Sequence, residues 1–426
     1  MQHTINFGTG FQRFNGWEYL CIDAANHYGM DKELFETRIQ FIEDNIDSLD
    51  LLADKAEDPE LFRKAAMVID RARRGLAVGH IVHFDACCSG IQIMSALTGC
   101  IAGAYNTGLI DPHQRMDAYS NTTAEMNRLL LEAGHATITV PRKDVKQAVM
   151  TSGYGSKAVP KRVFGEGAML DTFYNAAMII APGAFQLMDE LLGSWRPFAL
   201  DHTLVFPDGF TAVMKVMEAK ETRIEVDELD HATFTLQYRV NEGVERGRSN
   251  VANTIHCCDS YLLRGIERRC NYDPAVVCVA SEILVNAQQM RVSGTKQQAL
   301  GEVDDFTTLV KLGMKAKIAD LSLLPLLTAD NVHKLPDWML NKLVSITADM
   351  LTYKPFPIIT VHDAFGCHAN NCDITRYWYK ESMADFADSE LLAMLMNQLY
   401  QITDGVYEKL SPDLGDKIRN SNYALS

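Results

Sequence analysis

The sequence predicts a mainly helical α+β protein, and three observations support this prediction. Most of the chain has apolar residues at helical spacing. A few short runs of β-branched and aromatic residues are scattered between these helical stretches. No internal repeat or low-complexity linker divides the chain. Helices interleaved with a few strands are typical of the α+β class.

Start signals and apolar spacing predict the helices. Asp31 is expected to cap a helix whose apolar stripe runs to Ile46. Asp58 and Pro59 are expected to open another, which ends near Arg74. Pro141 should open a helix that continues through Tyr154 and beyond. Further helical stretches are predicted over residues 89–105, 112–133, 168–192, 253–269, 272–354 and 376–400.

Two short apolar strands are expected to end in carboxylates. Residues 79–85 lead to Asp85, and residues 355–365 contain Asp363 near their end. Side by side in one sheet, the two carboxylates would offer hard oxygen ligands for Mg²⁺. Two such ions about 4 Å apart could catalyse an in-line phosphoryl transfer. The alternative is a pair of unrelated turn aspartates. A separate β region spans residues 199–240, with a hairpin turn at 207–209.

The composition indicates a soluble globular protein. No basic stretch followed by an apolar one opens the chain, so no signal peptide is expected. The most apolar stretch, 176–185, is short and broken by Pro182, so no membrane partner is expected. The ten cysteines include no CxxC pair and are predicted to be reduced thiols of a cytosolic protein. Zinc at His256, Cys257 and Cys258 is an alternative that neighbouring ligands fit poorly.

The formal net charge of −15 argues against bulk attraction to nucleic acid, but the charge is unevenly distributed. The segment 142–162 contains six basic residues and a single acidic one, and three arginines lie within 264–269. A basic seam on an acidic body can still hold a phosphate backbone. The alternative is a solvated basic helix face.

The segment 142–157 has the residue types that a triphosphate site needs. On a helix, Arg142 and Lys146 would lie roughly 40° apart, with Tyr154 some 80° further on. A guanidinium can bind a terminal phosphate through two hydrogen bonds. A lysine can neutralise the charge that builds on the reacting phosphate or protonate the leaving pyrophosphate. Tyr154 could stack beside a templating base or test the sugar, and Gly155 permits close approach. A plain amphipathic helix is the alternative.

In this order, the three segments resemble motifs A, B and C of the phage- and mitochondrial-type single-subunit RNA polymerases. Motif A resembles DACCSGIQ at 85–92, motif B resembles RKDVKQAVMTSGYGSK at 142–157, and motif C resembles HDAFG at 362–366. Segments outside the motifs are also similar to that family, namely 16–45, 206–210, 253–259 and 423–426. The resemblance covers most of the chain except residues 272–354.

The resemblance implies a right-hand fold of palm and fingers with a small antiparallel palm sheet. The implied regions are a palm-associated helical segment (1–77), a palm part with motif A (78–113), the fingers with motif B (114–255), and a palm part with motif C (256–426). The last region includes a helical insert at about 272–354. We expect the family's N-terminal promoter domain to be absent.

The resemblance also implies an activity and its main residues. The chain would transfer nucleotides from NTPs to the 3′ end of a nascent RNA on a DNA template. Asp85 and Asp363 would bind two Mg²⁺ ions with help from the Ala86 carbonyl. Arg142 and Lys146 would bind the incoming triphosphate, with Lys146 acting in catalysis.

The remaining implied residues concern the sugar and the growing end. Tyr154, beside Gly155, would help select a ribose and gate translocation. His362 would lie near the RNA 3′ end and His256 near the primer-side minor groove. The related A-family DNA polymerases carry a glutamate where this chain has Gly90, which favours ribonucleotides here. An A-family-like DNA polymerase and a non-catalytic structural subunit are the alternatives.

The resemblance further implies a partner subunit. The chain begins just after the place where the family carries a T/D-x-x-G-R motif, and Glu245–Arg248 imitates that motif too far downstream. We therefore expect a second, smaller subunit, as in the heterodimeric RNA polymerase II of the N-four-like phages. This chain would be the larger, catalytic subunit, in the cytoplasm of an infected bacterial host. A truncated chain is the alternative. The insert would contact the partner, the DNA or a single-stranded-DNA-binding accessory protein.

Overall fold

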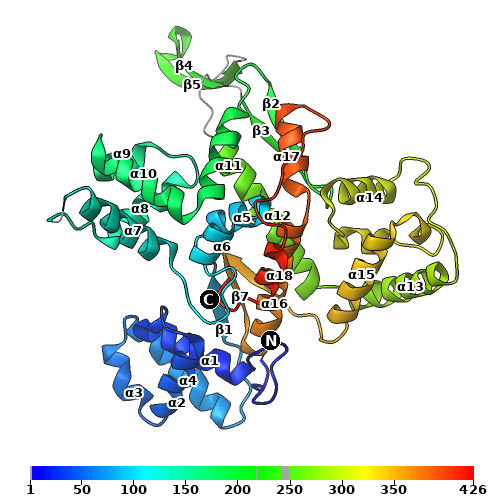
Figure 1. The fold of residues 1–426 in the computed structure, drawn as a ribbon, viewed down its shortest axis with the longest axis horizontal. Coiled ribbons are helices and arrows are strands. Elements are labelled where there is room, and N and C mark those ends of the chain that lie inside the picture. The colour runs from blue at the N-terminus through cyan, green and yellow to red at the C-terminus, as the bar shows by residue number, and fades with distance from the viewer. Residues whose placement is uncertain (1, 136, 217, 241–248, 362) are drawn as a thin grey trace.

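The computed structural model describes residues 2–135, 137–216, 218–240, 249–361 and 363–426. His362 and the whole imitation motif at 245–248 therefore cannot be placed, because they lie outside the described residues. In the described part, groups of helices lie around a three-stranded sheet and two separate hairpins, all of them antiparallel (Figure 1). This arrangement confirms a mainly helical protein with small antiparallel sheets.

The helices before the first strand are α1 (Gly16–Ala25), α2 (Phe35–Asp44), α3 (Leu49–Leu52) and α4 (Pro59–Arg73). Asp58 caps α4 as predicted, and Pro59 is its first residue. The prediction that Asp31 is the N-cap of α2 is wrong. A π-helical turn prolongs α1 as far as Asp31, so the chain first becomes extended at Leu34, the observed N-cap of α2.

The central sheet has the order β1 (Ile81–Asp85), β7 (Ala364–His368), β6 (Ile359–Val361). The strand that ends in Asp85 is confirmed. The single strand predicted over 355–365 is instead a hairpin, because pairing starts only after Pro357 and stops at Val361. Asp85 pairs with Ala364, so Asp363 lies in the turn at the same end of the sheet.

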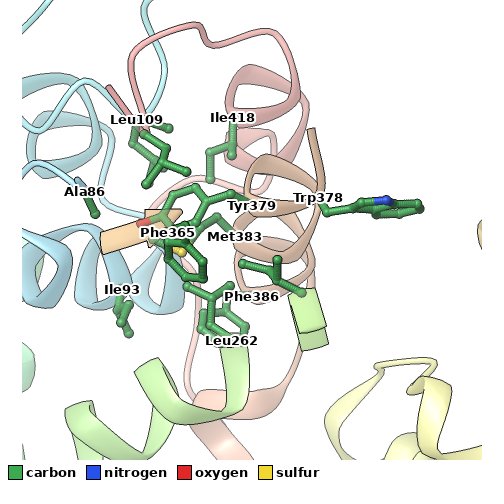
Figure 2. Packing of buried hydrophobic residues seen from close by; sticks show 14 of the residues in the cluster. Ala86, Ile93, Leu109, Leu262, Phe365, Trp378, Tyr379, Met383, Phe386 and Ile418 are labelled. Atoms are coloured by element: carbon green, nitrogen blue, oxygen red, sulfur yellow. The ribbon is translucent and has the colours of Figure 1, made fainter. Parts of the chain in front are cut away.

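Strand β7 packs on α16 (Cys372–Asp388), and α5 (Ser89–Thr98) and α12 (Ser249–Cys270) pack on α16 and on each other. Figure 2 shows Phe365 of β7 among Tyr379 and Met383 of α16, with Ile93 and Leu262 close by from α5 and α12. All five side chains are buried. Burial of one such side chain stabilises a fold by about 1.5–3 kcal/mol. This core therefore holds β7, and with it the turn that contains Asp363, in place.

Two helices near this core are interrupted where the sequence predicted continuity. Further elements here are α6 (Ile101–Asn106), α17 (Leu391–Tyr400) and α18 (Leu414–Arg419). The helix predicted over 89–105 breaks at Gly99, whose φ of 72° ends α5 in the left-handed region. The helix predicted over 376–400 begins earlier, at Cys372, and breaks at Ser389, where the backbone becomes extended.

The next group comprises α7 (Ala118–Glu132), α8 (Arg142–Ser152), α9 (Ala158–Phe164), α10 (Ala168–Ile180) and α11 (Pro182–Gly193). α7 begins later than predicted because Asp117 is its N-cap. α8 begins after Pro141 as predicted but ends before Tyr154, which lies in the following turn. Pro182 divides the long helix predicted over 168–192, since proline cannot donate to the helical ladder.

Two hairpins account for the predicted β region. In the first, β2 (Asp201–Val205) pairs with β3 (Thr211–Lys215) through the predicted turn at 207–209. In the second, β4 (Glu218–Val226) pairs with β5 (Ala232–Val240), and this ribbon projects from the body (Figure 1).

The stretch 272–354 is helical, as predicted, and contains α13 (Pro274–Val292), α14 (Asp305–Ala316) and α15 (Asp337–Met350). It forms a lobe on the opposite side of Figure 1 from α7–α10. Among the described residues, no helix is long and apolar enough to cross a bilayer. The ten cysteines are all free.

Candidate functional site

The two aspartates singled out in the sequence lie at one end of the central sheet. The Ala86 backbone N–H donates to the Asp363 carbonyl at 3.3 Å, which ties the end of β1 to the turn before β7. Both aspartates line one cavity of about 1150 Å³. Partial withdrawal from water and repulsion by Asp363 raise the pKa of Asp85, while His83 opposes the shift. The structure thus brings together two carboxylates that a divalent cation would relieve of mutual repulsion.

The C-terminal residues support this end of β1. Leu425 forms a β-bridge with Ala86, and the Ser426 N–H donates to the Asp85 carbonyl at 3.0 Å. Arg376 of α16 is buried and donates from Nε to the Leu425 carbonyl at 3.0 Å. The segment 423–426 therefore lies beside the aspartates, and α16 holds it there.

The small-residue turn after Asp85 adopts an unusual backbone. Cys88 has a φ of 63°, in the left-handed region that β-carbon-bearing residues rarely occupy, and it precedes the first turn of α5. Burial raises the pKa of the Cys88 thiol to about 12, and burial also raises that of Cys87. Both thiols are therefore protonated at neutral pH, so we assign them a structural role and not a nucleophilic one.

The two cations of α8 face the same cavity. Arg142 donates from Nε to Asp117 Oδ2 at 2.8 Å and to Ser120 Oγ at 2.9 Å. The Lys146 ammonium lies 5.6 Å from the centre of the Tyr119 ring, and the Arg142 guanidinium lies 5.7 Å from it. Both cations thus lie beside the same aromatic ring at the cavity wall, at distances that allow cation–π attraction.

Asp117 and Tyr119 are site residues that the sequence reasoning missed. An aspartate two residues before an aromatic at the start of an apolar helical stretch is a capping signal, but we predicted the helix to start near Pro112 instead. Burial and the neighbouring Cys88 raise the pKa of Tyr119, so its phenol stays neutral.

Tyr154 lies over the start of α5. A β-carbon built on Gly90 would lie 2.8 Å from the Tyr154 Oη, so the absence of a side chain at position 90 makes room for the ring. The Tyr154 ring centre is 5.1 Å from that of His256 on α12. Gly155 has a φ of 85°, which a β-carbon would strain. Gly90, Tyr154 and Asp363 line one small pocket beside the main cavity.

Charges of both signs line the main cavity. Its described lining includes five cations, namely Lys32, Lys64, Arg115, Arg142 and Lys146, and five carboxylates, namely Asp23, Asp31, Asp85, Asp117 and Asp363. Several are paired with each other, including Arg142 with Asp117. The lining therefore has no excess of positive charge that would attract a polyanion until cations bind to the carboxylates.

The predicted basic seam is only partly present. Lys161 of the segment 142–162 pairs with Glu166. Among the three arginines of 264–269, Arg264 donates to Asp208 at 2.7 Å. The other two also have carboxylate neighbours: Arg268 approaches Asp208 and Asp320, and Arg269 approaches Asp385. Acids of the same chain therefore already contact these arginines, and their binding of a phosphate backbone stays a prediction.

The donor set at the sheet end suits Mg²⁺. Asp85 and Asp363 provide hard oxygen ligands, and the adjacent Ala86 carbonyl is a third oxygen of the same kind. In the described residues, a tighter group of potential ligands, Glu225, Asp227 and His231, lies at the exposed tip of the β4–β5 hairpin. That group is remote in sequence from the three motifs and does not line the cavity.

Part of the chain around this cavity is similar to known proteins. Residues 13–172 match the family described as DNA-dependent RNA polymerase, and this span includes Asp85, Arg142, Lys146 and Tyr154. Over this part of the chain, the protein is similar to DNA-dependent RNA polymerases.

Two similar proteins carry the names of mitochondrial RNA polymerases. DNA-directed RNA polymerase 1, mitochondrial, of Arabidopsis thaliana is 30% identical over 221 residues, which cover 43% of this chain and 23% of that protein. The mitochondrial DNA-directed RNA polymerase of Schizosaccharomyces pombe is 34% identical over 171 residues, or 34% of this chain and 15% of that protein. The chain thus spans less than a quarter of the length of these two relatives.

Proposed function

We propose that this chain is the catalytic part of a DNA-dependent RNA polymerase, which joins NTPs to an RNA 3′ end on a DNA template. The observation that carries the proposal is the meeting of Asp85 and Asp363 at one sheet end, in a cavity also lined by Arg142 and Lys146. The relationship of residues 13–172 to DNA-dependent RNA polymerases supports it.

Asp85, Asp363 and the Ala86 carbonyl would hold two Mg²⁺ ions. When bound, the ions would lower the pKa of the attacking 3′ hydroxyl and stabilise the leaving oxygen. Arg142 would bind a phosphate through two hydrogen bonds, and Lys146 would neutralise charge on the departing pyrophosphate. Because the cavity lining has balanced charge, we expect NTP binding to depend on divalent cations.

Gly90, Tyr154 and Gly155 would form the ribose-selecting surface. A glutamate at position 90 would meet a 2′ hydroxyl, and the absence of a side chain there leaves room for the Tyr154 ring. His256 contacts that ring and would face the primer-side minor groove. His362, for which the sequence predicts a place near the RNA 3′ end, stays a prediction.

The larger organisation belongs to the same proposal. Residues 78–113 and 256–426 would form the palm, 114–255 the fingers, and 1–77 a helical palm-associated segment. A smaller second subunit would supply the rest of a complete enzyme, as in the N-four-like phages, and the phage origin and host cytoplasm stay predictions. The insert at 272–354 would contact that subunit, the DNA or a single-stranded-DNA-binding protein.

A primer-extension assay tests the proposal. The chain, purified with any co-purifying subunit, should extend a primer on a DNA template with ribonucleotides, and Asp363→Asn should abolish extension. Preference for deoxyribonucleotides would favour an A-family-like DNA polymerase. Extension that persists undiminished in Asp363→Asn, or is absent from the complete complex, would contradict the proposed catalytic role and leave a structural subunit as the better assignment.

A further inference from the structure

Asp117 joins the first turn of α7 to the first residue of α8. Its Oδ1 accepts from the Tyr119 N–H at 3.1 Å, and its Oδ2 accepts from Ser120 Oγ at 2.6 Å. The same Oδ2 accepts from Nε and Nη2 of Arg142. The carboxylate is therefore fixed by its own helix before it contacts Arg142.

The geometry leaves Arg142 able to bind a second anion. Asp117 contacts the guanidinium along its Nε–Nη2 edge, whereas the Nη1–Nη2 edge is a separate bidentate edge. The Asp117 side chain is 13% exposed, and that of Arg142 is 37% exposed on the cavity wall. One edge thus contacts Asp117, while the Arg142 side chain stays partly exposed at the cavity wall.

We infer that Asp117 is a positioning residue that holds Arg142 ready for the substrate triphosphate. This inference rests on the proposed function of the cavity. A free arginine side chain loses rotamer freedom when it binds, a loss that corresponds to roughly a tenfold change in an equilibrium constant. Asp117 removes much of this rotamer freedom before the substrate binds.

The opposite role is that of a competitor, in which Asp117 must be displaced by the triphosphate. Competition would make the wild-type chain bind phosphate more weakly than a variant without the carboxylate. Asp117 contacts the Nε–Nη2 edge of Arg142, and this favours the positioning role. A phosphate on the Nη1–Nη2 edge does not require Asp117 to leave. The two roles therefore predict opposite signs for one substitution.

The test is a double-mutant cycle on binding of magnesium tripolyphosphate, measured by isothermal titration calorimetry. Asp117→Asn keeps a capping side chain but removes the charge that holds the guanidinium. We expect it to weaken binding about tenfold in the wild-type background. It should have no further effect in Arg142→Ala, and Asp117→Glu should recover part of the affinity.

Asp273→Asn is the matched control, since Asp273 caps α13 through the same contact to the residue two positions on. It should leave tripolyphosphate binding unchanged. If Asp117→Asn fails to fold, Ser120→Ala removes the hydrogen bond to Asp117 and the one that Ser120 Oγ accepts from Arg142, and it should weaken binding about threefold.

Unchanged or tighter binding by Asp117→Asn, an equal loss in the Arg142→Ala background, or no binding by the wild-type chain would overturn the inference. Primer extension decides the proposed function separately. In an active enzyme, Asp117→Asn should raise the KM for NTPs more than it lowers kcat. Coupling in the calorimetric cycle without any extension would leave the positioning role standing and refute the polymerase assignment.

Discussion

Substitution of Gly90 should displace Tyr154 and reduce nucleotide incorporation. A β-carbon at position 90 would lie 2.8 Å from Oη and 3.0 Å from Cζ of Tyr154, closer than van der Waals contact allows. The tyrosine is a partly buried side chain and must swing away to relieve the overlap. Overpacking of this kind costs about 1–3 kcal/mol. If the ring must return to its place in the transition state, the rate falls roughly 5- to 150-fold.

Two substitutions separate the displacement of the ring from the selection of the sugar. Gly90→Ala adds only the methyl group, so it should lower kcat/KM for ribonucleotides and deoxyribonucleotides alike. Gly90→Glu adds a carboxylate that would also meet a 2′ hydroxyl, so its loss should be larger with ribonucleotides. Single-nucleotide incorporation on a primed template, with each nucleotide type, measures both effects.

Tyr154→Phe provides the control, because it removes the Oη that comes closest to position 90. Combined with Gly90→Ala in a double variant, it should reduce the loss of kcat/KM that Gly90→Ala causes. Wild-type kinetics for Gly90→Ala with both nucleotide types would refute the packing of Tyr154 on Gly90. Equal losses with both types for Gly90→Glu would remove the argument for ribose selection.

Three further predictions concern stability. Asp363→Asn should raise the melting temperature in metal-free buffer, because it relieves the repulsion that raises the pKa of Asp85, and it should abolish the stabilisation by Mg²⁺ seen in the wild type. Burial lowers the pKa of Lys409 to about 8 from 10.5, so the unfolded chain binds this proton more tightly and stability should rise with pH in that window. In urea unfolding at pH 8 and pH 10, the free energy of unfolding should rise less for Lys409→Met than for the wild type. Arg376→Met should cost about 2–4 kcal/mol in the same assay, since it leaves buried carbonyls, including that of Leu425, without their donor.

Local signals in the sequence predicted the parts of the site that depend on local structure. Asp85 follows an apolar run and precedes small residues, which suffices to predict a strand end. Pro141 predicted the start of α8 because its φ suits a first turn and it needs no donor. The order of the three motifs then suggested that distant segments meet, and the pairing of β1 with β7 brings Asp85 and Asp363 to one end of the sheet.

Features that depend on long-range partners were not predictable in this way. Asp117 lies 25 residues before Arg142, and nothing local indicates that they pair. The sequence predicted a phosphate seam at Arg264 and Arg268. Their partner Asp208 is more than 50 residues away, so the ion pairs could not be recognised from the local sequence. Tyr154 was expected on the helix of Arg142, but α8 ends first and the tyrosine packs on Gly90 instead.

The central proposal is that Asp85 and Asp363 together bind a divalent metal ion. Iron-mediated cleavage tests it directly, because Fe²⁺ in a magnesium site generates radicals that cut the nearby backbone when ascorbate and peroxide are added. Fragment mapping by mass spectrometry should locate cuts beside both residue 85 and residue 363, and excess Mg²⁺ or Asp85→Asn should suppress both. Cuts confined to the exposed hairpin tip at 225–231, or cuts at 85 and 363 that survive in Asp85→Asn, would contradict the claim.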